Sequence, residues 1–281
     1  MTREEKKELF SRTERLIGEK ALDRLSAARV AVFGIGGVGG YVCEALVRSG
    51  IGHFTLVDSD TVSLSNLNRQ IIALHSTIGR NKTEVMKERM LDINPDVKVE
   101  VRNCFYLPEN ADEFDFKEYD YVVDAVDTVT AKIEIIMRAK AENVPVISSM
   151  GAGNHLDPSS FRAADLYQTS MCPLAKVMRR EMKKRGVKSL KVVYSTEEPV
   201  RPAAFLYGEN VAKRDPAGEE TENSFPGNVP MQGSGGEGVK EKAPGKKAVP
   251  GSVAFAPSAA GLILASEVVK DLIEDGNRSD G

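Results

Sequence analysis

Arg29-Val-Ala-Val-Phe-Gly-Ile-Gly-Gly-Val-Gly39 is a short apolar run that ends in a glycine cluster. Residues 41–49 follow with a helix-like pattern, and a second apolar run, residues 53–57, leads to Asp58. This order predicts a strand, a tight turn, a helix and a second strand, which together form one βαβ unit. The unit favours an α/β, Rossmann-like domain.

The glycine cluster satisfies the pattern G-x-G-x-x-G with Gly34, Gly36 and Gly39. Glycines let the backbone turn sharply and approach a phosphate at a helix N-terminus, where N–H groups and the helix dipole favour an anion. Asp58 lies 19 residues after Gly39, at the place where a carboxylate accepts hydrogen bonds from ribose hydroxyls. These residues predict a nucleotide site, for which a plain NAD-binding Rossmann domain is the alternative.

The residues beyond the second apolar run favour a triphosphate. Ser65-Asn-Leu-Asn-Arg-Gln70 and then Gly79-Arg-Asn-Lys82 place basic side chains near the glycine turn. Phosphoryl and nucleotidyl transfer depend mostly on positioning and on neutralising charge, which basic side chains provide. The pattern resembles the ATP site of the ThiF/MoeB superfamily, the ubiquitin-activating-enzyme-like adenylyltransferases that attach AMP to a carboxylate. The residues that carry the resemblance are Gly34, Gly36, Gly37, Gly39, Asp58, Ser65, Asn66, Arg69, Gln70 and Lys82.

The resemblance also implies a role for the acids at residues 119–127, Tyr-Asp-Tyr-Val-Val-Asp-Ala-Val-Asp. In the family, an aspartate placed like Asp127 works near the phosphates and Mg²⁺, so we expect Asp127 and Thr128 in the ATP site and Asp127 as a candidate Mg²⁺ ligand. For Asp124 two readings stay open: it points into the crevice, or it fixes a loop or a helix end.

The N-terminal residues 1–28 have helical periodicity. The piece F-x-R-T-x-R-L-x-G-x-x-A-L at residues 10–22 resembles one branch of the superfamily, in which an arginine at the place of Arg15 reaches the ATP phosphates, often of the partner subunit. The resemblance implies a homodimer and catalytic roles for Arg15, Arg69, Lys82 and Asp127. The alternative for Arg15 is a solvated side chain on a surface helix.

The composition is that of an ordinary globular protein, with 281 residues, 41% hydrophobic and 28% charged. Cys43, Cys104 and Cys172 form no C-x-x-C pair, which argues against a disulfide framework and a four-cysteine zinc site. The start is too charged for a signal peptide, and no apolar run approaches a membrane span. We expect a cytoplasmic protein without membrane contact.

The rest of the chain predicts a doubly wound, mostly parallel sheet with antiparallel strands in an extended distal half. We expect four parts: the helical segment 1–28, the ATP-binding domain 29–200, a flexible Gly/Pro-rich loop over 201–251, and a strand (252–256) and helix within 252–281 that complete the domain. Asn81-x-x-Glu84 has the form of a capping box and predicts a helix start at Asn81.

A basic run lies between Lys176 and Lys191, with eight Lys or Arg residues against the single acid Glu181. The net charge of −3 gives no global attraction to nucleic acid, so this local concentration is a candidate contact for a phosphate backbone. A solvated helix face is the alternative. The candidate tRNA-binding residues are Arg179, Arg180, Lys183 and Lys184.

The N-terminal piece, the missing zinc cysteines, a strand ending Ser195-Thr-Glu197 and the terminal helix together resemble the tRNA threonylcarbamoyladenosine dehydratase branch. That resemblance implies ATP-dependent cyclisation of the threonylcarbamoyl side chain of a modified adenosine next to the anticodon. One alternative is activation of a ubiquitin-like sulfur carrier, with a sulfur-transfer protein as partner, and another is a degenerate nucleotide-binding scaffold. Cys172 would be the thiol for carrier chemistry, although a buried thiol is the other reading.

Overall fold

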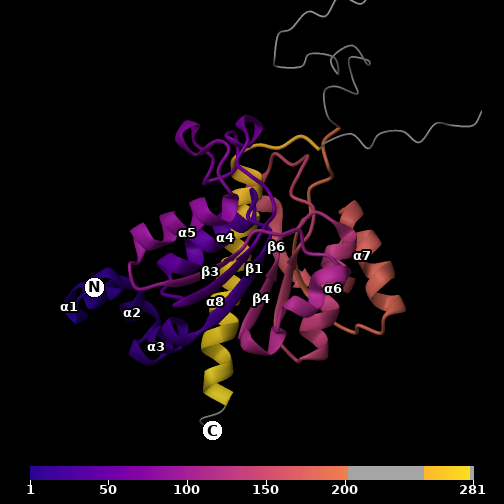
Figure 1. Cartoon of the computed structure of the whole chain (residues 1–281). Coiled ribbons are helices and arrows are strands. Elements are labelled where there is room, and N and C mark those ends of the chain that lie inside the picture. Colours follow the sequence, from indigo (N-terminus) through magenta and orange to yellow (C-terminus); the bar gives the residue numbers. More distant parts are fainter. Residues whose placement is uncertain (202–249, 279–281) are drawn as a thin grey trace, which may run out of the picture. The chain divides into compact units, whose positions relative to one another are not determined.

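A seven-stranded sheet organises the part of the chain that the computed structural model describes, residues 1–201 and 250–278 (Figure 1). The strands lie in the order β3-β2-β1-β4-β5-β7-β6. Their bounds are β1 Arg29–Phe33, β2 His53–Val57, β3 Lys98–Arg102, β4 Tyr121–Asp124, β5 Val146–Ser149, β6 Phe161–Asp165 and β7 Lys191–Ser195. All neighbours pair in parallel except β6 and β7, which are antiparallel. The predicted mostly parallel sheet with an antiparallel distal part is confirmed.

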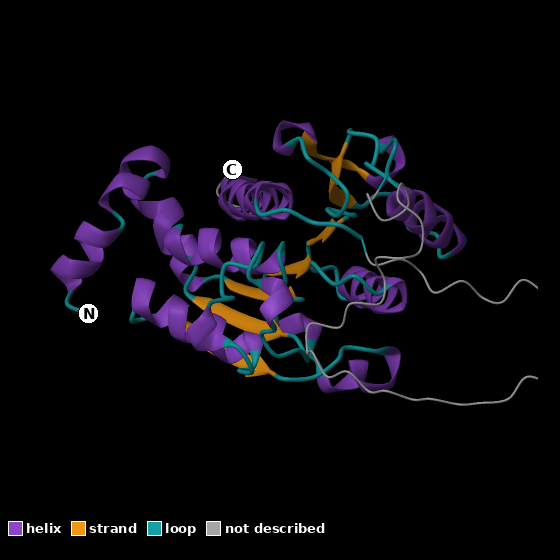
Figure 2. Ribbon diagram, turned by 90° about the horizontal axis from the view of Figure 1, so that it is seen from above, coloured by secondary structure: helices purple, strands orange, loops and turns teal. Residues whose placement is uncertain are grey.

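Helices cover both faces of this sheet, as the view from above shows (Figure 2). Their bounds are α1 Arg3–Leu9, α2 Ser11–Ile17, α3 Glu19–Ala27, α4 Gly39–Arg48, α5 Lys82–Ile93, α6 Val129–Ala141, α7 Pro173–Lys184 and α8 Phe255–Arg278. One core joins Val30 and Val32 of β1 to α4, α5 and α8, and the other joins Ala31 and Phe33 to α6 and α7. Because both faces are buried, β1 is apolar along its length rather than alternating.

The carboxyl ends of the strands meet where the order of the sheet reverses. β1 pairs with β2 on one side and with β4 on the other, so the connections leave β1 and β4 in opposite directions. Ligands of open α/β sheets bind at such a point. The glycine turn after β1 and the loop after β4 therefore border the same crevice.

The N-terminal helices pack at the other end of the sheet. The backbone N–H groups of Gly52 and His53, at the amino end of β2, donate to carbonyl oxygens of Leu25 and Ala28 at the end of α3. Phe10, at the start of α2, is buried close to Gly50. Figure 1 accordingly places α2 and α3 away from the glycine turn.

The C-terminal region differs from the prediction, because residues 252–254 form no strand and α8 begins at Phe255. A methyl group added to Gly261 would lie 2.5 Å from the carbonyl oxygen of Val38, so α8 and α4 pack with their backbones in close approach. Pro257 fits in the first turn of α8 because its missing N–H would have no partner there. Tertiary packing thus extends the helix over residues that would also suit a strand.

The helix start predicted at Asn81 is confirmed, since Asn81 is the N-cap of α5, but the predicted capping box is wrong because the Asn81 side chain makes no capping hydrogen bond. Asn81 instead forms a bridge with Thr61, and the Lys82 N–H donates to the Asp60 carbonyl oxygen at 3.0 Å. Backbone pairing therefore fixes the start of α5.

The described residues divide into compact units, and none of their helices could span a membrane. Residues 1–200 and the segment from 252 onward form one compact unit, and residues 201–251 are assigned to another. The predicted flexible loop falls in that second unit, and its residues 202–249 lie outside the described residues. Within the described ranges, no helix has both the length and the apolar character needed to cross a bilayer.

Candidate active site

The turn between β1 and α4 is closely packed at two of its glycines, Gly34 and Gly39, and open at a third, Gly36. A methyl group at Gly39 would lie 1.8 Å from the Gly34 carbonyl oxygen, and one at Gly34, where φ is +89°, would lie 2.7 Å from that of Ala125. A methyl group at Gly36 meets nothing nearer than Gln70 Nε2 at 4.0 Å. Two glycines are thus required by the fold, whereas Gly36 leaves space for a ligand to approach the backbone.

Asp58, at the end of β2, connects the turn to the following loop. Its Oδ2 accepts a hydrogen bond from the N–H of Ile35 at 2.6 Å, and its Oδ1 accepts one from the N–H of Asp60 at 2.8 Å. Each carboxylate oxygen has a second lone pair. The carboxylate therefore holds the glycine turn in place and keeps acceptor capacity for ribose hydroxyls.

Lys82 is held at the same edge of the sheet by an acid that the sequence analysis did not identify. Its Nζ lies 2.7 Å from Oδ2 of Asp60, and the exposed fractions of the two side chains are 6% and 64%. A buried ammonium needs such a partner, because desolvation of an unpaired charge is costly. The repeat of aspartate two residues after Asp58 was the only sequence signal for this pair.

The loop after β2 brings Arg69 beside the glycine turn. A methyl group at Gly37 would lie 3.5 Å from Arg69 Cγ and 3.3 Å from Pro257 Cβ. Arg69 Nη1 donates to the Ser65 carbonyl oxygen at 2.8 Å and to Asn68 Oδ1 at 2.9 Å. The guanidinium therefore rests on its own loop, with further donors for an anion.

Asn66 and Ser65 have different surroundings. Asn66 is buried, and its Oδ1 accepts a hydrogen bond from the Ser63 N–H at 3.1 Å. Ser65 is exposed, with its hydroxyl 3.0 Å from that of Ser63. Asn66 thus shapes the loop that carries Arg69, whereas Ser65 is accessible.

An unsatisfied polar group marks the turn as a place for a ligand. Gln70 is buried, and its Oε1 is one of the buried side-chain atoms of the described residues that have no hydrogen-bond partner. Its amide is also the nearest group to a methyl placed at Gly36. Because buried polar groups are normally paired, these residues fit a nucleotide, whose hydroxyl and amino groups supply donors.

The two acids after β4 have separate positions. Asp127 is exposed and accepts a hydrogen bond from Thr128 Oγ1 at 3.3 Å. Asp124 is fully buried and pairs with Lys132 of α6. Of the two readings for Asp124, the structure supports the loop-fixing acid, and Asp127 alone is accessible at the crevice.

Arg15 lies on α2, at the amino end of β2 rather than beside the glycine turn (Figure 1). Its side chain is exposed and makes no hydrogen bond or ion pair with a residue of the described ranges. The next residue, Leu16, is 85% exposed. A single chain therefore does not bring Arg15 together with Arg69, Lys82 and Asp127.

The basic run is divided among different contacts. Arg179 Nη1 donates to the Thr169 carbonyl oxygen at 2.9 Å, and Lys191 Nζ lies 2.7 Å from Asp271 of α8. Arg180, Lys184 and Arg185 surround Glu181 at 3.2, 3.2 and 2.8 Å. Their hydrogen bonds, that of Arg185 foremost, lower the pKa of Glu181 to about 2.

Three lysines of the run, Lys176, Lys183 and Lys188, are exposed, and no hydrogen bond or ion pair joins them to the described residues. The eight cations therefore do not form one uniform surface.

No described group of three or more His, Cys, Asp or Glu residues could hold a metal ion. Cys172 is buried at the start of α7, as the structural reading of this thiol predicted. The site therefore offers carboxylate, ammonium, guanidinium and backbone N–H groups rather than a thiolate or a metal cluster.

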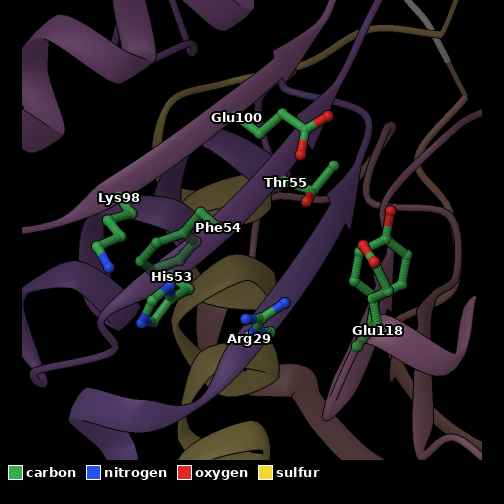
Figure 3. A pocket seen from close by; sticks show the side chains of 8 residues that line it. Arg29, His53, Phe54, Thr55, Lys98, Glu100 and Glu118 are labelled. Atoms are coloured by element: carbon green, nitrogen blue, oxygen red, sulfur yellow. The ribbon is translucent and has the colours of Figure 1, made fainter. Parts of the chain in front are cut away.

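A hollow of about 220 Å³ lies at the amino ends of β1, β2 and β3 (Figure 3). Its lining residues are Arg29, His53, Phe54, Thr55, Lys98, Glu100, Glu118 and Tyr119. None of the predicted site residues borders it. Since the glycine turn lies at the carboxyl ends of the strands, this hollow is separate from the crevice.

The comparisons with known proteins agree with this geometry. The model of the ThiF family matches residues 10–280. The tRNA threonylcarbamoyladenosine dehydratase of Bacillus subtilis is 41% identical over 267 residues, covering 95% of each chain. The structure of the Escherichia coli enzyme in complex with ATP has a TM-score of 0.77 and 31% identity and covers 97% of this chain and 96% of that one.

A molybdopterin-synthase adenylyltransferase of Haemophilus influenzae is 32% identical over 126 residues, which cover 45% of this chain and 51% of that protein. The likeness to the Bacillus subtilis dehydratase thus extends over about twice as much of the chain, including the distal half. From the match over residues 10–280 and the likeness to the Bacillus subtilis enzyme, the chain belongs to the ThiF family.

Proposed function

We propose that this protein is an ATP-dependent tRNA threonylcarbamoyladenosine dehydratase. The observation that carries the proposal is the open backbone at Gly36, with Asp58 bonded to the adjoining Ile35, Arg69 beside Gly37 and Lys82 held by Asp60 at the same edge of the sheet. The relative from Bacillus subtilis, aligned over 95% of this chain, bears that name, and a similar solved structure contains ATP.

The first chemical step is adenylation of the substrate's threonyl carboxylate. A carboxylate oxygen attacks the α-phosphorus of ATP, the bond between the α-phosphorus and the bridging oxygen breaks, and pyrophosphate leaves. A carboxylate is a poor electrophile, and the AMP that it gains is a good leaving group. Arg69 and Lys82 stabilise the negative charge that develops on the phosphates.

The second step closes the ring. The carbamoyl group of the same side chain attacks the activated carbonyl carbon, the bond from that carbon to the AMP oxygen breaks, and a proton is lost. The oxygen that the substrate loses thus leaves in AMP, so the net change in the nucleoside is loss of water. Because nucleophile and electrophile belong to one side chain, the effective molarity of the nucleophile is on the order of 10⁵ M or more. The ring closure therefore needs no thiol of the enzyme.

We propose that the active enzyme is a homodimer in which Arg15 reaches the phosphates of the partner's site. Two observations support this: Arg15 is on α2, which packs at the end of the sheet opposite the glycine turn (Figure 1), and the adjoining Leu16 is 85% exposed. In a homodimer the partner chain would cover Leu16 and give the Arg15 guanidinium the anionic partner that it lacks among the described residues of its own chain.

We assign Asp127 to Mg²⁺. The carboxylate is exposed beside the glycine turn and has only the weak contact with Thr128. Mg²⁺ is typically held by one or two carboxylates together with substrate phosphates and water, so the lack of a larger acidic cluster is compatible with it. When bound, the ion neutralises phosphate charge.

We propose that the tRNA backbone contacts the exposed cations of α7 and the residues after it, chiefly Lys183, Lys184 and Arg180. Arg179, which we expected in this set, has an internal role through Thr169.

The net reaction couples ATP cleavage to a covalent change as ligases do, and a tRNA substrate is consistent with a cytoplasmic enzyme. A sulfur-transfer partner would accompany only the carrier-protein alternative.

The deciding experiment is nucleoside analysis of tRNA that carries threonylcarbamoyladenosine, after incubation with the protein and ATP. We expect the cyclic nucleoside with wild-type protein and with Lys87→Ala, a matched control on α5, and none with Lys82→Met. Labelled AMP on a ubiquitin-like carrier, with unchanged tRNA, would instead establish the carrier-activating alternative. ATP binding without either product would leave the scaffold reading.

A further inference from the structure

A fully buried ion pair lies beneath the loop that carries Asp127. Lys132 Nζ lies 3.2 and 3.1 Å from the two carboxylate oxygens of Asp124 and donates to the Ser149 carbonyl oxygen at 2.7 Å. Ser148 Oγ donates to Asp124 Oδ2. The side chains of Lys132 and Asp124 are 1% and 0% exposed. The pair thus joins the carboxyl ends of β4 and β5 to the first turns of α6.

Stability alone is a poor reason for such a pair. Desolvation of two buried charges consumes most of their mutual attraction, and well-packed apolar residues in the same place are often as stable. A buried pair that also bonds to neighbouring polar groups does, however, define one arrangement of the backbone, because any displacement leaves a charge unpaired.

The backbone that this pair defines belongs to the crevice. Asp124 Oδ1 accepts a hydrogen bond from the Val126 N–H at 3.2 Å, and the next residues are Asp127 and Thr128. On the other side, the Ala125 N–H donates to the Phe33 carbonyl oxygen at 2.8 Å. Gly34 approaches the Ala125 carbonyl so closely that a methyl group would lie 2.7 Å from it.

We propose that Lys132 is a positioning residue for AMP transfer, which acts through Asp124 to hold Asp127 against the glycine turn. This inference rests on the proposed function. Ala125 keeps its own bond to β1, so the side of the loop that faces Gly34 is retained when Lys132 is lost. Asp127 and Thr128 depend on the bond from Val126 to Asp124 and become misplaced.

The position of this pair predicts a separation of binding from chemistry. The double variant Asp124→Asn/Lys132→Met removes both charges, and the amide offers one acceptor oxygen where the carboxylate offered two, so it no longer accepts hydrogen bonds from both Ser148 and Val126, which bond to separate oxygens of Asp124. We expect the single-turnover rate of AMP transfer to fall about 10–100-fold, the loss that small misplacements of reacting groups produce. The Kd for ATP, measured by calorimetry, should change less than about threefold.

β4 supplies a matched control at its other end. Tyr121 OH donates to Asp271 Oδ2 at 2.6 Å, and Lys191 Nζ lies 2.7 Å from Oδ1 of the same aspartate. Asp271→Asn/Lys191→Met therefore removes an ion pair between β7 and α8 whose carboxylate also accepts the hydrogen bond from Tyr121 at the amino end of β4. It should lower the Tm without slowing AMP transfer at a temperature where both variants are folded.

A second readout is independent of tRNA and of activity. Amide hydrogen exchange at Val126, whose N–H is bonded to Asp124, should become faster in Asp124→Asn/Lys132→Met and stay unchanged in the control, because only the first variant weakens that bond. Unchanged exchange at this amide would overturn the proposal, as would wild-type AMP transfer in the double variant. Slower transfer in both double variants, in proportion to their Tm values, would overturn it in favour of a purely structural role.

The dehydratase function itself is tested by a different measurement, the formation of the cyclic nucleoside. If wild-type protein forms no cyclic nucleoside, the dehydratase assignment falls. The exchange measurement, which needs only the protein, still decides whether Lys132 holds the loop.

Discussion

Gly36→Ala is expected to separate nucleotide binding from folding. The structure leaves the space above this residue open, with Gln70 Nε2 at 4.0 Å as the nearest atom to an added methyl group. That is ordinary van der Waals contact. If phosphates approach the backbone here, the methyl group occupies their position and nothing else.

The magnitudes follow from these distances. Replacing a glycine whose backbone tolerates alanine stabilises a protein by about 0.4–1 kcal/mol, because the unfolded chain loses conformational freedom. The Tm should therefore stay constant or rise by about 1–4 °C for a chain of this size. A methyl group forced between the loop and a phosphate costs about 1–3 kcal/mol, as overpacking does, which corresponds to about 5–150-fold weaker ATP binding.

Gly39→Ala is the matched comparison in the same turn. Its methyl group would lie 1.8 Å from the Gly34 carbonyl oxygen, so the backbone must shift. We expect a loss at the upper end of the overpacking range, about 3 kcal/mol, and a Tm lower by about 6–12 °C.

Scanning fluorimetry with and without ATP, and calorimetric titration of ATP, measure both effects. Wild-type ATP affinity in a well-folded Gly36→Ala protein would show that the nucleotide does not approach this backbone. A Tm loss in Gly36→Ala equal to that of Gly39→Ala would refute the packing argument.

Three further predictions address the subunit interface, the tRNA and the pH. Mixing inactive Arg15→Ala with inactive Lys82→Ala subunits should restore activity in heterodimers; no restoration despite measured subunit exchange contradicts a shared site. Lys183→Ala/Lys184→Ala should raise the KM for tRNA and flatten its salt dependence by a slope of about 0.7–0.9 per lost contact, whereas superimposable titrations at two salt concentrations exclude this surface. Burial raises the pKa of Glu44, but hydrogen bonds from two arginines outweigh it and hold that pKa below its usual value, so its stabilisation is complete above about pH 4.3 and is lost as the pH falls through the lowered pKa. Glu44→Gln should remove this part of the acid dependence of the free energy of unfolding, and an unchanged dependence between pH 3 and 7 counts against it.

The sequence predicts the first βαβ unit well because its signals are local. The apolar run of β1, the glycines of the turn and the apolar face of α4 each lie within a few residues of one another. The resemblance assigns Arg69 and Lys82 to the crevice for a similar reason, since both belong to short motif pieces, residues 65–70 and 79–82, that follow closely after β2.

The first residues of α8, the C-terminal helix, show where local sequence signals do not predict the structure. Ser252-Val-Ala-Phe-Ala256 suits a strand or a helix start equally, since short apolar runs have no decisive period. The close approach of Gly261 to Val38 decides for the helix, and it joins residues more than 200 positions apart. No window of neighbouring residues contains that information.

The prediction of one tRNA-binding surface from the basic run is only partly correct, for a related reason. Counting cations along the chain treats them as one surface, but folding directs them to different neighbours. Arg179 bonds to Thr169, and Lys191 bonds to α8. Charge counted in sequence is therefore an upper limit for the charge that a tRNA can meet.

The ion pair of Asp60 and Lys82 at the crevice is another contact that the sequence did not predict. Asp58 bonds to Ile35 of the glycine turn and to the Asp60 N–H, and Asp60 in turn holds Lys82 by its carboxylate and its carbonyl oxygen. The carboxylate assigned to the ribose and the ammonium assigned to the phosphates are thus linked through one short loop. We expect a ligand that binds Asp58 also to hold the loop that positions Lys82, so that ribose binding and neutralisation of the phosphates are coupled. Residues that a motif presents as separate contacts act here as one connected unit.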